Sequence, residues 1–543
     1  MPVSLPVLGA IGVLLYGLWH FLQDYFLSSP LDNLPGPASS SLLQGHIQEI
    51  FARRGWKFLK DLSERYGPVT RLRGLLGARM LIVYDPKALH SLLIKDADSY
   101  PKCSAPFDEF MLFLGPSVLT TDGGQHRRQR KQLNPVFSAA HLRNMMHLFY
   151  DIAHRVRKAL EHRVASAPRG DVVDVNGWMA RTTLEMLGQA TLGYSFDNFV
   201  DDSTDAFGES LKGFFPTYAR IALVGFLIPP FSYFLPQRVC RAVLRAIPHA
   251  DIRKMMHISD TMAQRSLEII NEKKMALLKG DDVMREKVGE GKDLMSILLK
   301  ANMLASEADR LSDEELIAQM STFILAGMDT TANSLTRILH VLAEHPAEQE
   351  KLRAEVSEAR LGNDITYEAL EKLPYLDAVC RETLRLYSPV NVIGRTSAKD
   401  MTLPLLTPVM RKNGSLVSEV AVPERTWILA NIQASNYNRA LWGEDAYEWK
   451  PERWLKPFPA SLEDARIPGV YSNLLSFSGG SRSCIGFKFS QLEMKILLSI
   501  LLSTFKFETT GRTVTWNTSG VSYPTMGESS DKPELLLKVI KVG

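Results

Sequence analysis

Ten residues near the C-terminus carry the strongest chemical pattern in the chain. Residues 477–486 read Phe-Ser-Gly-Gly-Ser-Arg-Ser-Cys-Ile-Gly. A cysteine thiolate is a strongly electron-donating iron ligand, provided that nearby groups stabilise its charge. Gly480 and Gly486 let the backbone turn so that N–H groups face the sulfur, and Arg482 adds a cation. The pattern predicts Cys484 as an iron ligand, and the alternative is a glycine- and serine-rich loop with an incidental cysteine.

A second pattern lies in mid-chain, where residues 326–331 read Ala-Gly-Met-Asp-Thr-Thr. Placing Asp329 and Thr330 inside an apolar helix costs free energy unless the two side chains form hydrogen bonds or serve a function. An ordered hydroxyl and carboxylate can deliver protons to a reaction. The alternative is structural, because threonine in a helix often donates to the carbonyl one turn earlier.

The helix that would hold this segment has clear ends. Ser312 and Glu315 have the spacing of a capping box. His345 precedes a proline, where the helix must stop. The predicted helix has about 32 residues and is about 48 Å long, enough to span a domain. Gly327 weakens its middle.

Two charged residues further on have helical spacing. Glu382 and Arg385 are three positions apart and can form an ion pair on one helix face. Downstream, residues 451–454 read Pro-Glu-Arg-Trp and contain Arg453. A pair of this kind is common on protein surfaces, so alone it indicates little.

Together these patterns resemble the cytochrome P-450 family. Residues 477–486 match its Phe-x-x-Gly-x-Arg-x-Cys-x-Gly signature position by position. Glu382 to Arg385 matches its Glu-x-x-Arg helix, and residues 451–453 match the Pro-Glu-Arg partner of that helix. The resemblance runs in the family's order from the proline-rich residues 34–37 to the C-terminus, and it is closest in character to fungal microsomal members of the mushroom type.

The resemblance implies a haem b cofactor with Cys484 as the axial ligand of its iron. It also implies a mainly α fold with a small β region, in which haem lies between a long central helix and the cysteine loop. In that family the helix is distorted at the oxygen-activating segment, where Thr330 would hydrogen-bond bound dioxygen and Asp329 would relay protons. A buried charge triad for folding and haem retention would consist of Glu382, Arg385 and Arg453.

Further cofactor contacts follow from the same resemblance. Phe477 would pack against the macrocycle, and Arg482 would reach a haem carboxylate. The haem propionates would be held by Arg395, by Arg130 and by His126, where most relatives have tryptophan. His126 and Arg130 are four positions apart and share a helix face.

The remaining cations of that basic stretch have two interpretations. Arg127, Arg128 and Lys131 fit a solvated helix face. They fit equally well a docking patch for an acidic electron donor, because complementary charge speeds encounter.

Substrate contacts are predicted for apolar residues at the family's pocket-lining positions or beside the oxygen-activating segment. Each could equally be ordinary core. They are Phe107, Phe113, Ile324, Met328, Val392, Ile393 and Tyr523.

Composition excludes several classes of protein. Lys and Arg total 63 against 60 Asp and Glu, so nothing indicates a nucleic-acid partner. The four cysteines have no paired spacing, which argues against a disulfide framework or a zinc site. No glycine-rich dinucleotide or flavin motif is visible, so electrons would have to come from a separate protein.

The N-terminus predicts a membrane anchor. The first 22 residues contain no Asp, Glu, Lys or Arg, and about 20 apolar residues suffice to cross a bilayer as a helix. We expect a transmembrane anchor at residues 1–23, a proline-rich hinge at 24–39 and one catalytic domain at 40–543. A cleaved signal peptide is the alternative. A positive cluster after the anchor favours a catalytic domain in the cytosol, and the resemblance to microsomal members implies a single-pass protein of the endoplasmic reticulum membrane.

Short elements are predicted at both ends of the catalytic domain. Residues 69–73 and 79–84 alternate as two strands of a hairpin. From about residue 390 the chain becomes rich in strands and loops, and a helical pattern resumes at Gly486 and continues to about Phe505.

The resemblance implies a membrane-bound monooxygenase that inserts one oxygen atom of O2 into a lipophilic substrate. A sesquiterpene or triterpene of fungal secondary metabolism is the favoured substrate. NADPH would supply electrons indirectly, through NADPH–cytochrome P-450 reductase, with cytochrome b5 as an additional donor. The alternatives are a haem-thiolate isomerase or peroxygenase and a non-catalytic haem sensor, none of which needs the proton path of Asp329 and Thr330.

Overall fold

The computed structural model describes residues 27–102, 109–165, 170–200, 208, 213–225, 236–279, 292–471 and 473–542. The anchor predicted at residues 1–23 and the pocket residue Phe107 lie outside these ranges. Within the ranges, no helix combines the length and the apolar character that spanning a membrane requires.

The described residues belong to two compact units, each assembled from separate stretches of chain. Unit 1 takes them from Met1–Cys103, Asn391–Gly443 and Ala460–Arg482. Unit 2 takes them from Ser104–Val390, Glu444–Pro459 and Ser483–Gly543.

Unit 1 is built on a four-stranded sheet with the order β1-β2-β7-β4. The hairpin of β1 (Val69–Arg73) and β2 (Arg79–Val83) is antiparallel, as the alternation of residues predicted. β7 (Trp427–Asn431) runs parallel to β2, and β4 (Val392–Thr396) runs antiparallel to β7. A second antiparallel pair consists of β5 (Met401–Met410) and β6 (Leu416–Val422). Its α-helices are α2 (Ile47–Ile50), α3 (Gly55–Tyr66), α4 (Pro86–His90), α21 (Ile432–Asn436), α22 (Arg439–Trp442) and α23 (Ala460–Ala465).

Unit 2 is predominantly helical. Its described α-helices are α5 (Glu109–Leu114), α6 (Gly123–Leu133), α7 (Ala139–Asn144), α8 (Met146–Val164), α9 (Val175–Leu187), α11 (Phe214–Gly225), α13 (Gln237–Ala246), α14 (Ala250–Lys279), α16 (Leu294–Leu304), α17 (Asp313–Glu344), α18 (Pro346–Arg360), α19 (Tyr367–Glu371), α20 (Pro374–Leu386) and α24 (Phe487–Thr504). The helix predicted from Gly486 is therefore confirmed as α24.

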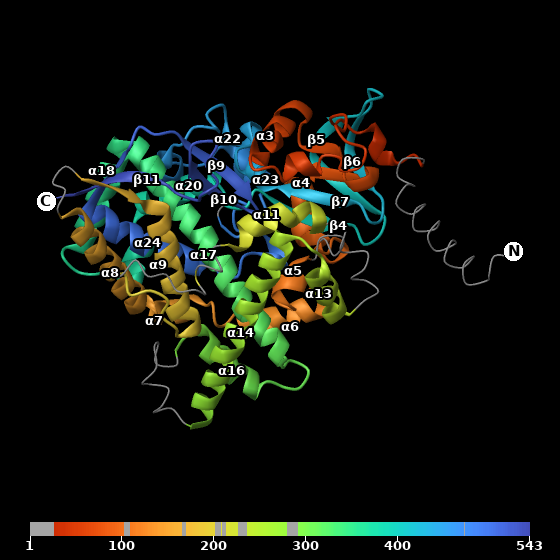
Figure 1. Cartoon of the computed structure of the whole chain (residues 1–543). Helices are drawn as coiled ribbons and strands as arrows, with labels where there is room; N and C mark the ends of the chain where they lie inside the picture. The colour runs from red at the N-terminus through yellow and green to blue at the C-terminus, as the bar shows by residue number, and fades with distance from the viewer. Residues whose placement is uncertain are drawn as a thin grey trace. The chain divides into compact units, whose positions relative to one another are not determined.

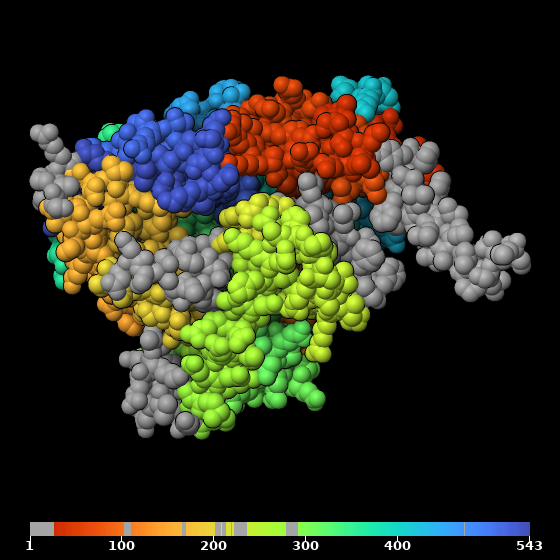
Figure 2. Space-filling model, in the orientation of Figure 1, coloured from red at the N-terminus to blue at the C-terminus, as the bar shows by residue number. Residues whose placement is uncertain are grey.

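Two small sheets complete unit 2. β11 (Leu536–Lys541) pairs with both β3 (Asp171–Asp174) and β8 (Phe505–Thr509), and β9 (Val514–Ser519) forms a hairpin with β10 (Val521–Met526). The pairing of β11 with β3 brings the last strands, blue in Figure 2, beside the orange surface of residues from the α8 region.

The long helix is confirmed with its predicted ends. α17 has 32 residues, Ser312 and Glu315 form a reciprocal capping box, and His345 is the C-cap. Figure 1 shows α17 in green, running through unit 2 beside α9. The expected distortion at the oxygen-activating segment is wrong for this structure. All of α17 is described, and it is α-helical without interruption from Asp313 to Glu344.

Close packing explains the glycine in the middle of α17. An added Cβ at Gly327 would lie 2.5 Å from Cδ1 of Leu187 on α9. Gly327 therefore does more than weaken the helix, because it allows α9 to approach the α17 backbone.

Glycine is also required at the end of unit 1 that precedes the predicted iron ligand. Gly480 opens the short 3-10 segment Gly480–Arg482. Its φ is +69°, and an added Cβ would lie 2.0 Å from the carbonyl oxygen of Leu93. Both the left-handed backbone and the close approach exclude a side chain here.

We expect Gly480→Ala to lower the thermal unfolding midpoint far more than Gly362→Ala. Gly362 has a similar φ of +85°, but no atom lies within 4 Å of its added Cβ. Gly362→Ala should therefore cost only backbone strain of roughly 1–2 kcal/mol, whereas Gly480→Ala adds a clash with backbone. Equal shifts of the two midpoints would contradict the close packing at Gly480.

Candidate active site

The sulfur of Cys484 lies two residues before the N-cap of α24. Burial raises the pKa of its thiol, while a hydrogen bond from the backbone N–H of Gly486 and the positive charge of Arg130 lower it. The net pKa stays above the ordinary value. Cys484 nevertheless keeps accessible surface. An exposed cysteine with a backbone N–H donor and a nearby cation has surroundings that suit a thiolate ligand.

Helix α6 holds the loop that carries this cysteine. Nη1 of Arg130 donates to the carbonyl of Ser483 at 2.9 Å, which joins residues 353 positions apart. His126 lies one turn earlier on α6 and is buried. Arg130 therefore contributes its positive charge to the surroundings of the predicted iron ligand and a hydrogen bond to the residue that precedes it.

The middle of α17, at residues 326–330, is partly accessible although most of the helix is buried. Ala326 is exposed, whereas Asp329 and Thr330 are half-buried. Oγ1 of Thr330 donates to the carbonyl of Ala326 at 2.8 Å. This is the local bond of the structural interpretation, yet the hydroxyl oxygen can still accept a further hydrogen bond.

A polar contact joins α17 to the helix that follows the cysteine. Oγ1 of Thr331 lies 3.1 Å from Oγ of Ser490 on α24. Ser490 is six residues after Cys484, so chain geometry limits their backbone separation to about 15 Å. The accessible sulfur and the accessible face of α17 are thus near enough for one cofactor to contact both.

Helix α9 supports the same turn of α17. Oγ1 of Thr183 donates to the carbonyl of Met328 at 3.2 Å, and both side chains are buried. Sequence reasoning missed Thr183, Thr331 and Ser490, because single hydroxyl residues in helices carry no pattern that reveals a contact with another helix.

The predicted pocket residues of unit 2 occupy different environments. Ile324 and Met328 are buried, and Tyr523 on β10 is half-buried. Phe113 is buried and packs edge-on against Phe214, with ring centroids 6.5 Å apart.

Unit 1 contains the other predicted contacts. Arg395 is buried on β4, and its Nη1 donates to the carbonyl of Gly394 at 2.8 Å. Val392 and Ile393 are half-buried on the same strand. Phe477 packs edge-on against Tyr471 at 5.6 Å between ring centroids. Arg482 ends the 3-10 segment that Gly480 begins.

The predicted charge triad is assembled within unit 2. Arg385 binds Glu382 through two hydrogen bonds of 2.8 Å, and both side chains are 0 % exposed. Nε of Arg453 lies 3.5 Å from Oε1 of Glu382. The indole N–H of Trp454 and the backbone N–H of Lys450 also donate to Glu382, at 2.9 and 3.0 Å. The buried carboxylate is therefore fully satisfied.

Two cations of the basic stretch form internal ion pairs. Arg128 binds Glu315 at 2.6 Å, and Lys131 binds Asp309 at 2.7 Å. Although burial raises the pKa of Glu315, hydrogen bonds from Gln125 and its neighbours hold it below its usual range. The contact with buried Glu315 favours a structural role for Arg128, whereas Lys131 is 67 % exposed and keeps both interpretations.

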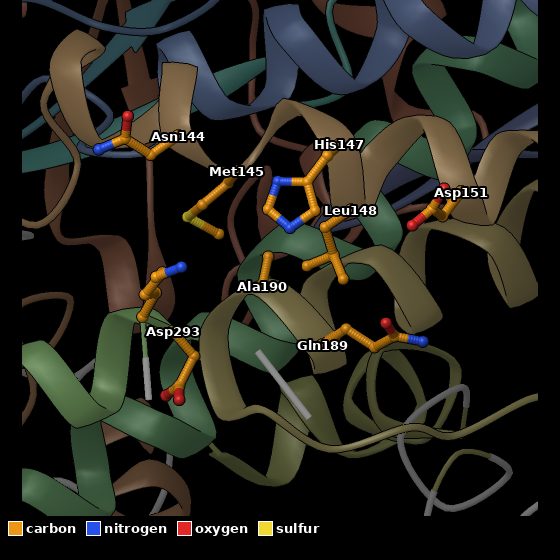
Figure 3. Close-up of a pocket in the computed structure, with 9 residues that line it drawn as sticks. Asn144, Met145, His147, Leu148, Asp151, Gln189, Ala190 and Asp293 are labelled. Atoms are coloured by element: carbon orange, nitrogen blue, oxygen red, sulfur yellow. The ribbon is translucent and has the colours of Figure 1, made fainter. Parts of the chain in front are cut away.

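A separate cavity of about 170 Å³ lies elsewhere in unit 2. Figure 3 shows His147 and Asp151 from α8 facing Gln189 and Ala190. Asp293, which also lines this cavity, forms an ion pair with Lys273, with an N–O distance of 2.8 Å. None of the predicted site residues lines it. Among the described residues, no group of three or more His, Cys, Asp or Glu could hold a metal ion.

Comparison with known proteins decides the family. The model of the family described as Cytochrome P450 matches residues 35–526. The chain belongs to the cytochrome P450 family. It is 56 % identical over 545 residues to a ganoderic acid synthetase of Ganoderma lucidum, with 99 % of each chain covered. It is 48 % identical over 530 residues to cytochrome P450 monooxygenase 91 of Postia placenta, with 97 % of each chain covered.

Membership of the cytochrome P450 family identifies the protein as a P450 monooxygenase. The family implies a haem cofactor, a redox partner and a lipophilic substrate. The donor set around Cys484 fits haem, since the thiol is accessible, hydrogen-bonded and next to a cation.

We expect Glu382→Gln to destabilise the P450 strongly. The substitution would leave Arg385 buried without its counter-charge, at a cost of about 3–5 kcal/mol. Glu368→Gln is the matched control, because Glu368 forms an ion pair with Arg143 in which both side chains are at least half exposed. Such exposed pairs are worth about 0–1 kcal/mol. Thermal unfolding midpoints and haem content should fall for Glu382→Gln alone, and equal effects would contradict the role of burial.

Proposed function

We propose that this P450 is a membrane-bound haem-thiolate monooxygenase that oxidises a terpenoid, with a triterpenoid as the first candidate. It would take electrons from NADPH through a separate reductase, with cytochrome b5 as an additional donor. One observation carries the proposal: unit 2 contains both the exposed Cys484 and the partly accessible Asp329–Thr330 segment.

Each predicted residue has a task in this proposal. Haem b bound through Cys484 supplies the iron that activates dioxygen. Gly486 and Arg130 stabilise the thiolate, since both lower the pKa of Cys484. Thr330 orients a proton donor toward the oxygen substrate, and Asp329 relays protons from solvent.

The remaining cofactor residues would bind the haem edge and face. His126, Arg130, Arg395 and Arg482 are the proposed partners of the haem carboxylates, because cations and ring N–H groups form strong hydrogen bonds with them. Phe477 would pack on the macrocycle.

The substrate class is supported by the relatives. One of them is named for the synthesis of ganoderic acid, a triterpenoid, and matches over 99 % of both chains. We therefore propose a triterpenoid substrate before a sesquiterpenoid or a fatty acid.

The membrane location is also part of the proposal. Its support is the stretch of 22 residues without Asp, Glu, Lys or Arg at the N-terminus. Residues 1–23 would anchor the enzyme in the endoplasmic reticulum membrane, with residues 40–543 as one catalytic domain in the cytosol.

Optical titration with a lanostane triterpene, a sesquiterpene and a fatty acid tests the substrate class. We expect the triterpene to give a saturable change in iron spin state, because a ligand beside the iron displaces water. A response to the fatty acid alone would reject the terpenoid assignment.

Thr330→Ala should uncouple oxygen use from product formation. Without the hydroxyl, the proton donor is no longer oriented toward dioxygen. NADPH is then still consumed, while hydrogen peroxide forms in place of product. Thr330→Ser retains the hydroxyl and should stay close to wild-type coupling. The measurement is product and peroxide formed per NADPH, and unchanged coupling in Thr330→Ala would remove Thr330 from the mechanism.

Cys484→Ser should yield a haem-poor, inactive protein, since a serine hydroxyl does not ionise at neutral pH to replace the thiolate. Haem content and the absorption spectrum of the reduced carbon monoxide complex provide the test. Normal turnover by this variant would overturn the assignment of the ligand.

A further inference from the structure

A carboxyl group without a hydrogen-bond partner lies in the core of unit 2. Glu493 on α24 is 0 % exposed. Neither carboxyl oxygen has a partner at hydrogen-bonding geometry in the described structure. Burial raises the pKa of Glu493 well above its usual range, and the neighbouring Thr331 hydroxyl only partly opposes this effect. Burial of an isolated carboxylate is costly, which favours the neutral carboxylic acid form of Glu493.

The cations on and near α24 named below bind groups other than Glu493. Lys495, on the same helix, forms ion pairs with Glu371 and Asp377 at 3.2 and 3.1 Å. Arg353 and Arg360 of α18 donate to groups at the C-terminal end of α24 and just beyond it. No counter-charge among these groups is available to Glu493.

Glu493 shares a face of α24 with a hydroxyl that contacts α17. Ser490 is three residues before Glu493, so the two side chains are neighbours on the helix surface. Oγ of Ser490 lies 3.1 Å from Oγ1 of Thr331. The carboxyl group thus lies beside a pair of hydroxyls that joins two helices.

Thr331 differs from the other hydroxyl residues in this part of α17. Thr330, Ser334 and Thr336 each donate to the carbonyl four residues earlier. The hydroxyl of Thr331 instead meets Ser490. It therefore joins α17 to α24, whereas Thr336 has a second contact of 3.3 Å with Asn176 of α9.

This contact lies where the proposed chemistry needs a fixed geometry. Thr331 follows the Asp329–Thr330 pair, and α24 begins three residues after Cys484. Rotation of α17 at this turn would move the Thr330 hydroxyl relative to the cysteine loop. A bond between Thr183 and the Met328 carbonyl holds the same turn from α9.

We propose that Glu493 is a positioning residue whose carboxyl proton orders the Thr331–Ser490 pair and thereby sets the orientation of the Asp329–Thr330 segment relative to the Cys484 loop. This inference rests on the proposed function for the role of Thr330. Stability does not explain a carboxyl group here, because an apolar side chain of similar size would avoid the cost of an unsatisfied polar group.

A positioning role and a purely structural role of Glu493 predict different effects of Glu493→Leu. If Glu493 is a positioning residue, Glu493→Leu keeps or raises the thermal unfolding midpoint and keeps its haem, yet forms about fivefold less product per NADPH, with more peroxide. Glu493→Gln retains a neutral hydrogen-bond donor and should stay within about twofold of wild type. Ser499→Ala is the matched control, because Ser499 is also buried in α24 but donates to the Ile496 carbonyl of its own helix.

Thr331→Val provides a second variant that does not alter Glu493. It removes the hydroxyl while nearly keeping the side-chain shape, so it should reproduce the uncoupling of Glu493→Leu. Combining the two substitutions should add little further loss, because both disrupt one network.

Infrared difference spectroscopy tests the protonation state without turnover. The wild-type protein at neutral pH should show the carbonyl band of a protonated carboxylic acid that is lost in Glu493→Gln. In Thr331→Val this band should shift, because the carboxyl loses its hydroxyl neighbour. The spectrum does not depend on which substrate the enzyme oxidises, so failure of the terpenoid assignment would leave this result interpretable.

Three outcomes would overturn the inference. One is the absence of a protonated-carboxyl band that Glu493→Gln removes. Another is wild-type coupling in both Glu493→Leu and Thr331→Val. The third is a parallel loss of haem and stability in both variants, which would make Glu493 a purely structural group.

Discussion

The middle of α17 must present polar groups at an accessible face while the rest of the helix stays in the core, and much of unit 2 serves this constraint. Gly327 lets α9 approach, Thr183 of α9 binds the Met328 carbonyl, and Thr331 meets α24 on another side. Since the backbone remains α-helical, the position of Thr330 is set by packing and hydroxyl contacts rather than by a break in the helix.

Three ionisable side chains of unit 2, those of Glu382, Cys484 and Glu493, have contrasting surroundings. Glu382 has two arginines, an indole and a backbone N–H around it, which is the complete satisfaction that a buried carboxylate needs. Cys484 has a backbone N–H donor and one cation that lower its pKa, although burial keeps the net pKa above the ordinary value. Burial raises the pKa of Glu493 well above its usual range.

The sequence was informative where a local rule decides the structure. The ends of α17 follow from a capping box and a proline, and the β1–β2 hairpin follows from alternating residues; both were predicted. The Glu382–Arg385 pair was foreseen from its spacing and the family motif. Its indole donor Trp454 was not, although it lies within the motif. Glu493, Thr183 and Ser490 could not be found either, because their importance depends on which helices pack together. The assigned roles of Cys484, Thr330 and Asp329 remain predictions that rest on the motif.

The order of the segments along the chain has a consequence for synthesis in the cell. Unit 1 needs residues up to Arg482 to close the packing of Gly480 on Leu93, and unit 2 needs β11 to pair with β3. Neither unit can therefore be completed while the ribosome is still translating the central helices. Cys484 emerges after most of the residues of both units, so a cofactor bound through its sulfur can be captured only late in synthesis.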